Sequence, residues 1–287
     1  IGWEISRDET FSDIAASGQA NASAANDYCA KIDARGLAPG RPYFYRFLSA
    51  SGPSVTGQTR TAPAGAAATL RAALFSCSNF AFGYFHAYAH AAAQDDIDLA
   101  LHCGDYIYEM ALGRYPSEAE TVPGRLIEPV RETTTLNEYY QRYAVYHTDA
   151  SLLELRRRKP LIAIWDDHEI ADNAWADGAL GHQSNEGNYA ERVASARKAY
   201  YDWMPIRGGP NTAAYRSFDW GDLARIIVLD TRLAGRSQPY RYSAAQVRAL
   251  TQGGDAAAAA LAEIRAALSN PARSMLGAVQ EDWLSRT

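Results

Sequence analysis

The stretch that decides the fold is LIAIWDDHE, residues 161–169. Its leading apolar residues are typical of a short strand that is buried on both faces of a sheet. Four ionisable side chains follow directly: Asp166, Asp167, His168 and Glu169. Because ionisable groups beside a buried strand cost free energy unless cations or hydrogen bonds compensate them, the stretch predicts a metal site at the strand end. A surface turn is the alternative, and the apolar strand in front of it argues against that reading.

A second apolar strand ends on an acid about 60 residues upstream. The segment IDLALHCGD, residues 97–105, ends on Gly104 and Asp105, and Tyr108 follows shortly after. A carboxylate that bridges two cations, with a phenolate on one of them, suits a hard trivalent ion, because hard cations prefer oxygen ligands. Asp105 as a helix cap, with Tyr108 as a packing residue, explains the same pattern. On these residues alone both interpretations stay open.

The chain beyond about residue 70 alternates between strand and helix patterns. Two further strands are predicted at 70–77, ending on Cys77, and at 224–230, ending on Asp230. Helices are predicted in four segments: 84–94, 136–158, 186–203 and 244–268, the last interrupted near residue 253. This alternation predicts an α/β domain over residues 64–287 with a largely buried sheet. We expect all four strands to deliver polar side chains at their carboxyl ends, the edge where open α/β folds bind ligands.

Residues 1–63 differ in texture and are predicted to be all-β. Apolar and polar residues alternate at 3–6, 27–33 and 43–47, and turn residues separate these stretches. The segment 36–45 resembles the turn and following strand of fibronectin type III modules. We therefore expect a small β-sandwich. Because the chain begins inside a strand pattern, we expect this sandwich to lack its first strand or strands.

The composition excludes several classes of protein. A hydrophobic content of 47% and a charged content of 21% are those of an ordinary globular protein. The net charge of −5 gives no case for a nucleic-acid partner, and the basic run at 156–159 reads as a solvated helix end. No apolar stretch is long enough to predict a membrane span, and residues 1–6 lack the features of a signal peptide.

The cysteine count bears on metal binding. Cys29, Cys77 and Cys103 are an odd number, so at least one thiol is free. This argues against a disulfide scaffold and favours a metal or redox role for one of them. A buried, apolar-like cysteine is the alternative for each.

Short motifs spread over nearly the whole chain carry a family resemblance. They are SCSN (76–79), GDYIYE (104–109), YAVY (143–146), WDDHE (165–169), DN (172–173), YDWMPIR (201–207), LDTR (229–232) and MLGAVQ (275–280). Together they resemble the alkaline phosphatase D (PhoD-like) family of the metallophosphoesterase superfamily. That superfamily has a Gly-Asp motif after one strand and an Asn-His-Asp/Glu motif after the next. Here Asp105 matches the first, and Asp167 stands where the second usually has Asn. The resemblance implies a layered α/β/β/α phosphoesterase fold behind the sandwich.

The resemblance also implies the metal ligands. It assigns iron(III) to Cys77, Asp105 and Tyr108, and calcium to Asp105, which is shared, and Asp167. Asn173 is implied either to complete the calcium site or to donate to a phosphate oxygen, and both roles stay open. The ligand types divide as expected, because thiolate and phenolate suit iron(III) whereas carboxylates suit calcium.

For catalysis, the superfamily mechanism makes His168 the proton donor to the leaving alkoxide, oriented by Glu169 or Asp166. Arg142 and Arg232 are candidates for phosphate contacts, with a structural ion pair as the alternative for each. With Cys77 as a ligand, the other two cysteines are expected in the core, and His102 is expected to be a packed or surface histidine.

The family pattern predicts further ligands beyond the present C-terminus. The superfamily completes its site with late motifs of the type Gly-Asp-x-His or Gly-His-x-His, and none follows Gln280. His182 is the last histidine of the chain. We therefore expect a continuation that carries further Asp, His or Asn ligands.

The implied activity is metal-dependent hydrolysis of phosphate monoesters or diesters at alkaline pH, with a metal-activated water as the nucleophile. The expected substrate is a small phosphate ester or a lipid or polymer phosphodiester, and the expected location is the bacterial periplasm or the medium. A degenerate, inactive surface-binding protein is the alternative, and the presence of the early ligands favours the enzyme. A Rossmann-type oxidoreductase is excluded, because residues 104–106 are not a Gly-rich phosphate loop.

Overall fold

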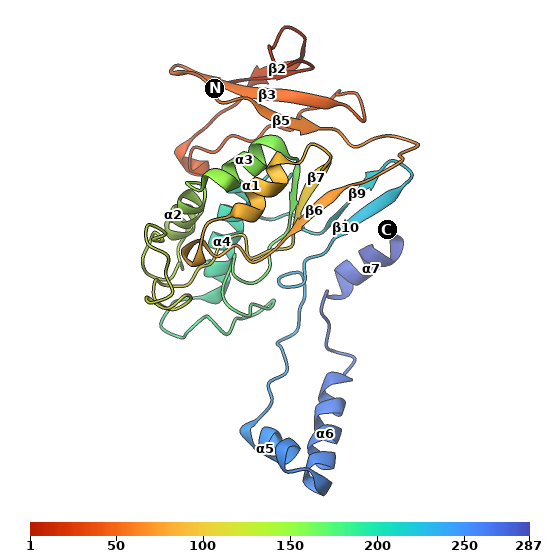
Figure 1. Cartoon of the computed structure of the whole chain (residues 1–287). Helices are drawn as coiled ribbons and strands as arrows, with labels where there is room; N and C mark the ends of the chain where they lie inside the picture. Colours follow the sequence, from red (N-terminus) through yellow and green to blue (C-terminus); the bar gives the residue numbers. More distant parts are fainter.

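The computed structural model describes residues 1–287. Figure 1 shows three parts: an N-terminal sheet at the top, a mixed α/β body in the middle and a helical arm that points away from the body. The division of the chain between residues 63 and 64 stays a prediction.

The N-terminal part is an antiparallel sheet. Its strands are β1 (Gly2–Ser6), β2 (Ile14–Gln19), β3 (Pro42–Ser49), β4 (Gly52–Pro53) and β5 (Gly57–Arg60). They lie in the order β2-β1-β3-β4, and β5 also pairs with β3. The all-β character is thus confirmed, in the form of one five-stranded sheet rather than two facing sheets.

The strand predicted at 27–33 is wrong. A single 3-10 turn, η1 (Ala24–Asn26), precedes this segment, and Asp27 and Tyr28 have positive φ angles. Its polar groups find partners outside the sheet: Asp27 accepts from the Trp203 indole at 3.1 Å, and Lys31 donates to the Ile206 carbonyl at 3.2 Å. The segment therefore runs along the body and joins it to the sheet.

The body contains the predicted parallel sheet. Strands β6 (Ala72–Phe75), β7 (Leu99–His102) and β8 (Leu161–Ala163) are parallel and lie in that order. The helices that accompany them are α1 (His86–Ala93), α2 (Leu136–Tyr146), α3 (Ala150–Arg158) and α4 (Tyr189–Trp203), and a 3-10 turn, η2 (Phe80–Phe82), follows β6. The buried core between them is rich in aromatic side chains, among them Tyr139, Tyr143, Trp165 and Tyr200.

The helix predicted at 136–158 is two helices, α2 and α3. Asp149 ends the first pattern because its side chain accepts from the backbone of Ser151 and Leu152 and so begins α3. The same buried carboxylate pairs with Arg125 at 2.6 Å.

The fourth predicted strand does not join the parallel sheet. It forms β10 (Ala224–Val228), which pairs antiparallel with β9 (Arg216–Trp220) in a separate two-stranded ribbon. The expectation of four strand ends on one edge is wrong in this respect. Asp230 still follows β10, where its carboxylate is buried and accepts from the backbone of Arg232 and Leu233.

The arm, residues 240–272, is a hairpin of α5 (Ala244–Gln252) and α6 (Gly254–Leu268). Two extended segments, residues 235–239 and 273–277, join it to the body and are called the neck (Figure 1). The last helix, α7 (Ala278–Arg286), returns to the body beside β10. None of the helices is both long and apolar enough to cross a membrane.

Candidate metal centre

The loops after β6 and β7 carry backbone strain. Cys77 has a φ angle of 58°, in a region that L-residues other than Asn and Asp seldom adopt, and Asp105 has a φ angle of 54°. The two loops hold each other, because the Cys77 amide donates to the Gly104 carbonyl at 3.1 Å and the Ser78 amide donates to the Asp105 carbonyl at 2.8 Å. Strain that is held in this way is typical of functional sites.

Gly104 allows the loops after β7 and β8 to touch. A Cβ atom on Gly104 would lie 2.3 Å from the backbone nitrogen of Asp166, and the φ angle of Gly104 is 105°. Only glycine fits there. This close approach brings Asp105 next to Asp167, which supplies the physical reason for the Gly-Asp pair in the sequence.

Four of the predicted ligands lie together. The Cys77 Sγ and the Tyr108 hydroxyl lie 3.4 Å and 3.1 Å from the same carboxylate oxygen, Asp105 Oδ2. Candidate ligand atoms of Asp105, Asp167 and His168 lie within 4.8 Å of one another. Thiol, phenol, carboxylates and imidazole therefore converge around one carboxylate.

This donor set fits metal ions. Asp105 and Asp167 are both buried, and burial raises the pKa of Asp167 to about 6 even though His168 and Arg232 oppose the shift. Burial raises the pKa of the Tyr108 phenol, and partial desolvation raises that of the thiol of Cys77, an exposed residue. The charge of Asp105 raises both further. Multivalent cations bound among these groups would favour their ionised forms and so oppose all three shifts.

The partner of His168 is Glu109, a residue that the sequence analysis quoted in a motif but gave no role. The Nδ1 atom of His168 lies 2.7 Å from Oε2 of Glu109, and the imidazole stacks on the Tyr108 ring with 4.2 Å between centroids. Glu109 is fully buried, and its other oxygen accepts from the Asp172 amide at 2.6 Å. Burial lowers the pKa of His168, but the hydrogen bond and charge of Glu109 outweigh this and raise it to about 10.

The prediction that Glu169 or Asp166 orients His168 is therefore wrong. Glu169 accepts from the backbone amides of Asp105, Tyr106 and Asp166 at 3.1, 2.6 and 2.8 Å. It braces the two strand-end loops instead, and burial together with the charge of Asp105 raises its pKa to about 8.

Arg232 occupies the edge of the centre. Its guanidinium binds Asp166 through Nε at 2.5 Å and Nη2 at 3.0 Å, and Nη2 also lies 3.1 Å from Asp167. Arg232 thus forms the structural ion pair that was the alternative to a phosphate contact. Asn173 lies beside Asp167, to which its amide donates at 2.5 Å, and its side chain donates to Asp172 at 2.7 Å. The roles of Arg232 and Asn173 toward a phosphate stay predictions.

The prediction of a phosphate contact for Arg142 is wrong. This side chain is fully buried and donates to backbone carbonyls of the excursion between β7 and α2, those of Tyr108, Met110, Glu128, Pro129 and Arg131. Arg142 therefore has a structural role, which it fulfils by binding backbone carbonyls rather than by forming an ion pair.

The other cysteines differ from their predicted burial. Cys103 is exposed and Cys29 is half-buried, so neither is a core residue. Alternation along β7 explains Cys103, because its neighbour His102 points inward, where its Nε2 lies 2.9 Å from the Ser78 hydroxyl and 2.8 Å from the Tyr88 hydroxyl.

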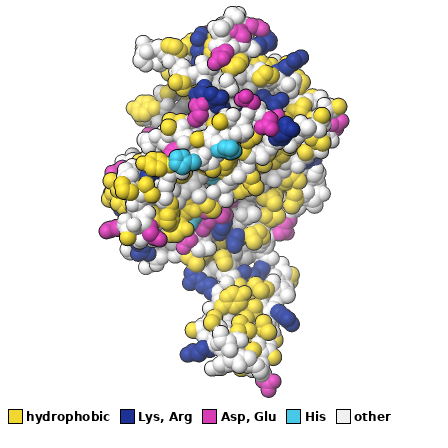
Figure 2. All heavy atoms as spheres, viewed as in Figure 1, with side chains coloured by type: hydrophobic (Ala, Val, Ile, Leu, Met, Phe, Trp, Pro, Cys, Tyr) yellow, Lys and Arg dark blue, Asp and Glu magenta, His cyan; other side chains and the backbone are white.

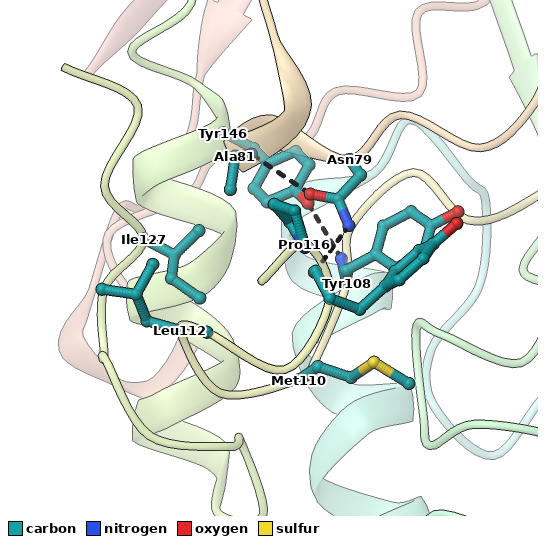
Figure 3. A pocket seen from close by; sticks show the side chains of 10 residues that line it. Asn79, Ala81, Tyr108, Met110, Leu112, Pro116, Ile127 and Tyr146 are labelled. Atoms are coloured by element: carbon teal, nitrogen blue, oxygen red, sulfur yellow. Dashed lines mark hydrogen bonds between the residues drawn. The ribbon is translucent and has the colours of Figure 1, made fainter. Parts of the chain in front are cut away.

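Hydrogen bonds fix the loop that carries Tyr108. The Tyr146 hydroxyl accepts from the backbone amides of Phe80 and Tyr108, both at 3.1 Å. Asn79 donates to the Tyr115 carbonyl at 3.0 Å. Figure 3 shows Asn79, Tyr108 and Tyr146 around a small pocket, with the apolar side chains of Leu112 and Ile127 on its other side. Hydrogen bonds thus join the loop that supplies Cys77 to the loop that supplies Tyr108.

Comparison with known proteins gives a consistent result. The family model for the PhoD-like phosphatase matches residues 72–287, and that for the PhoD-like phosphatase N-terminal domain matches residues 1–63. The chain is 35% identical to alkaline phosphatase D of Bacillus subtilis (strain 168) over 291 residues, which cover 99% of this chain and 46% of that protein. A solved structure of PhoD superimposes with a TM-score of 0.79 at 31% identity and covers 99% of this chain and 51% of that one. The chain thus spans about half the length of these relatives.

Proposed function

This chain belongs to the PhoD-like phosphatase family, and from that premise we propose that it takes part in metal-dependent hydrolysis of phosphate esters at the ends of β6, β7 and β8. The observation that carries the proposal is the contact of Cys77 and Tyr108 with one oxygen of Asp105, next to Asp167 and His168. A degenerate binding protein is disfavoured, because degeneracy removes such ligands and here they are assembled.

We propose iron(III) and calcium as the metals. Cys77, Tyr108 and Asp105 would hold iron, and Asp105 and Asp167 would hold calcium, with Asn173 as a further oxygen donor. The position of the thiol and phenol on one oxygen of Asp105 supports this division. When bound, the metals supply Lewis-acid polarisation of the phosphoryl group and a water nucleophile at alkaline pH.

The chain's own residues would move the proton and hold the phosphate. Glu109 accepts from Nδ1 of His168, which fixes the ring and stabilises the imidazolium, so that its second proton, on Nε2, is available to the leaving alkoxide. Arg232 uses Nε and Nη2 on Asp166 and Asp167, and Nη1 has no hydrogen bond within the chain, so it is our candidate donor to a phosphate oxygen.

Substrate and location rest on the family resemblance. We propose phosphate monoesters or diesters as substrates, including lipid or polymer phosphodiesters, and action in the periplasm or the medium. Fractionation of the producing cells, followed by immunodetection, tests the location, and a protein confined to the cytoplasm would contradict it.

The activity is tested with Asp105→Asn and, as a matched control, Asp95→Asn, because Asp95 is an exposed residue away from the centre. Both proteins are assayed with 4-nitrophenyl phosphate and bis(4-nitrophenyl) phosphate, alongside metal analysis. Asp105→Asn is expected to lose bound metal and to lower kcat/KM by more than about 100-fold, because even residues that only support a ligand cost 10- to 100-fold. Unchanged turnover in Asp105→Asn, or full activity of metal-stripped protein, would overturn the proposal.

A further inference from the structure

The neck contains a polar cavity that the proposed function does not use. It has a volume of about 200 Å³ and is lined by Arg236, Ser237, Pro239, Arg273, Ser274 and Met275. By comparison, one water needs about 10–15 Å³ on the same measure, so an anion fits with part of its hydration shell. Figure 2 shows Lys and Arg side chains gathered at this level, between the body and the arm.

The walls of the cavity are held together by the backbone. The Ser237 amide donates to the Ser274 carbonyl at 2.9 Å, and the Ser274 amide donates to the Ser237 hydroxyl at 3.0 Å. Gly235 and Gly277 approach so closely that a Cβ atom on Gly235 would lie 2.6 Å from the Gly277 Cα. The two segments of the neck are therefore fixed relative to each other.

The two arginines in the cavity wall have no carboxylate partner. Arg236 donates to the Thr231 carbonyl at 3.2 Å and contacts the Met275 sulfur at 3.1 Å, and Arg273 donates to the Gln238 carbonyl at 2.8 Å. Each guanidinium has five N–H donors, so most of them are left over. A carboxylate in contact with the wall, that of Glu281, accepts from the Ser274 hydroxyl. Two unpaired like charges on one cavity favour a bound anion.

The wall of the cavity is tied to the metal centre through Arg236. Arg232, which binds Asp166 and Asp167, lies shortly before Arg236 in the sequence. The Arg236 carbonyl accepts from the Ala176 amide at 3.1 Å, which ties the neck to the loop that follows Asn173. The charges of Arg232 and the two aspartates act on the Arg236 side chain, whose pKa is lowered mainly by burial. Arg232 thus lies at the metal centre, whereas Arg236 and Arg273 lie in the cavity wall of the neck.

We propose that the neck cavity is a second anion subsite, which takes a second phosphate group of a phosphate ester whose scissile phosphate lies at the metal centre. A guanidinium fork matches phosphate geometry and retains its charge at alkaline pH. The proposal rests on the proposed function and makes esters that carry two phosphates its preferred substrates.

The test compares propane-1,3-diol bisphosphate with propane-1,3-diol monophosphate. Arg236→Gln and Arg273→Gln are made in the whole chain, with Arg248→Gln as the control, because Arg248 is exposed on α5 and makes no side-chain hydrogen bond. We expect the wild-type KM to be lower for the bisphosphate. Each neck variant should raise the ratio of bisphosphate KM to monophosphate KM about tenfold, the typical loss for one charge-assisted hydrogen bond. The control should leave the ratio unchanged.

Calorimetric titration of the same proteins with both compounds separates the two proposals, because it needs no turnover. Absent turnover of both compounds would contradict the proposed function, and the calorimetric ratio of affinities would still test the subsite. Equal loss of affinity for both compounds, no loss in either neck variant, or an equal loss in Arg248→Gln would overturn the subsite. Longer diol bisphosphates then measure the spacing between the two phosphates.

Discussion

The loops of the metal centre and the helices of the arm are held in opposite ways. Around the centre, backbone hydrogen bonds fix the strained Cys77 and its neighbour Asp105: the Cys77 amide donates to the Gly104 carbonyl, and the Asp105 amide donates to the buried Glu169 carboxylate. In the arm, only Ala260 and Ile264 are buried. Regions with few buried contacts open at low free-energy cost, whereas densely braced regions open with the whole domain. Geometry is thus enforced at the metal centre, where the chemistry needs it, and the neck marks the boundary between the braced body and the loosely packed arm.

The largest expected effect concerns His168. Its replacement in His168→Ala should lower kcat about 10²- to 10⁴-fold for alkyl phosphates, the range for loss of a general acid. The loss should be small for nitrophenyl esters, whose leaving group hardly needs a proton. His90→Ala, on the exposed face of α1, is the control and should match the wild type. An equal loss with both substrate types would assign His168 to metal binding or structure.

Gly104→Ala and Gly253→Ala test, through the free energy of unfolding, whether the loops of the metal centre are held more tightly than the arm. Both glycines have positive φ angles, but a Cβ on Gly104 meets the Asp166 backbone whereas nothing lies within 4 Å of one on Gly253. We expect the free energy of unfolding to fall by about 2–5 kcal/mol in Gly104→Ala, from strain plus overpacking. Gly253→Ala introduces only backbone strain, about 1–3 kcal/mol at φ 78° and ψ −166°. Because the arm opens on its own, this strain should lower the global free energy of unfolding by less than about 0.5 kcal/mol. Urea unfolding measures both, and equal losses would contradict the contrast between braced loop and arm.

Glu109→Gln tests whether Glu109 supports His168 in catalysis. The amide retains the shape but loses the charge that stabilises the protonated His168, so kcat should fall about 10- to 100-fold, as for other supporting residues. The loss should again be larger for alkyl than for nitrophenyl phosphates, which a purely structural defect would not produce. Glu118→Gln, at an exposed position, is the matched control. Wild-type activity of Glu109→Gln would remove Glu109 from the mechanism.

The smallest effect is expected in the arm. Leu155 in α3 and Ile264 in α6 are both buried, but only Leu155 belongs to the core of the body. Leu155→Ala should lower the global free energy of unfolding by about 2–5 kcal/mol. Ile264→Ala should change it by less than about 0.5 kcal/mol while amide exchange in α5 and α6 accelerates, because the arm opens on its own. A global loss in Ile264→Ala comparable to that in Leu155→Ala would show that the arm and body unfold together.

The sequence by itself determined the family and which candidate ligands lie together. The resemblance drawn from its short motifs is confirmed over residues 1–63 and 72–287. Apolar runs identified β6, β7 and β8, and parallel neighbours place their carboxyl ends side by side, so Cys77, Asp105 and Asp167 had to lie close together. This inference needs only local periodicity and one rule of sheet geometry.

Only the tertiary structure decided which side chains pair across the loops. Glu109 binds His168 and Arg232 binds Asp166 over separations of 59 and 66 residues. The same holds for the burial of Arg142, for the pairing of β10 with β9 and for the loss of the predicted strand at 27–33. Periodicity shows which face of an element is buried but not which polar groups it will meet there. Those partners are chosen by the folded arrangement, where most buried donors and acceptors must find a partner at once.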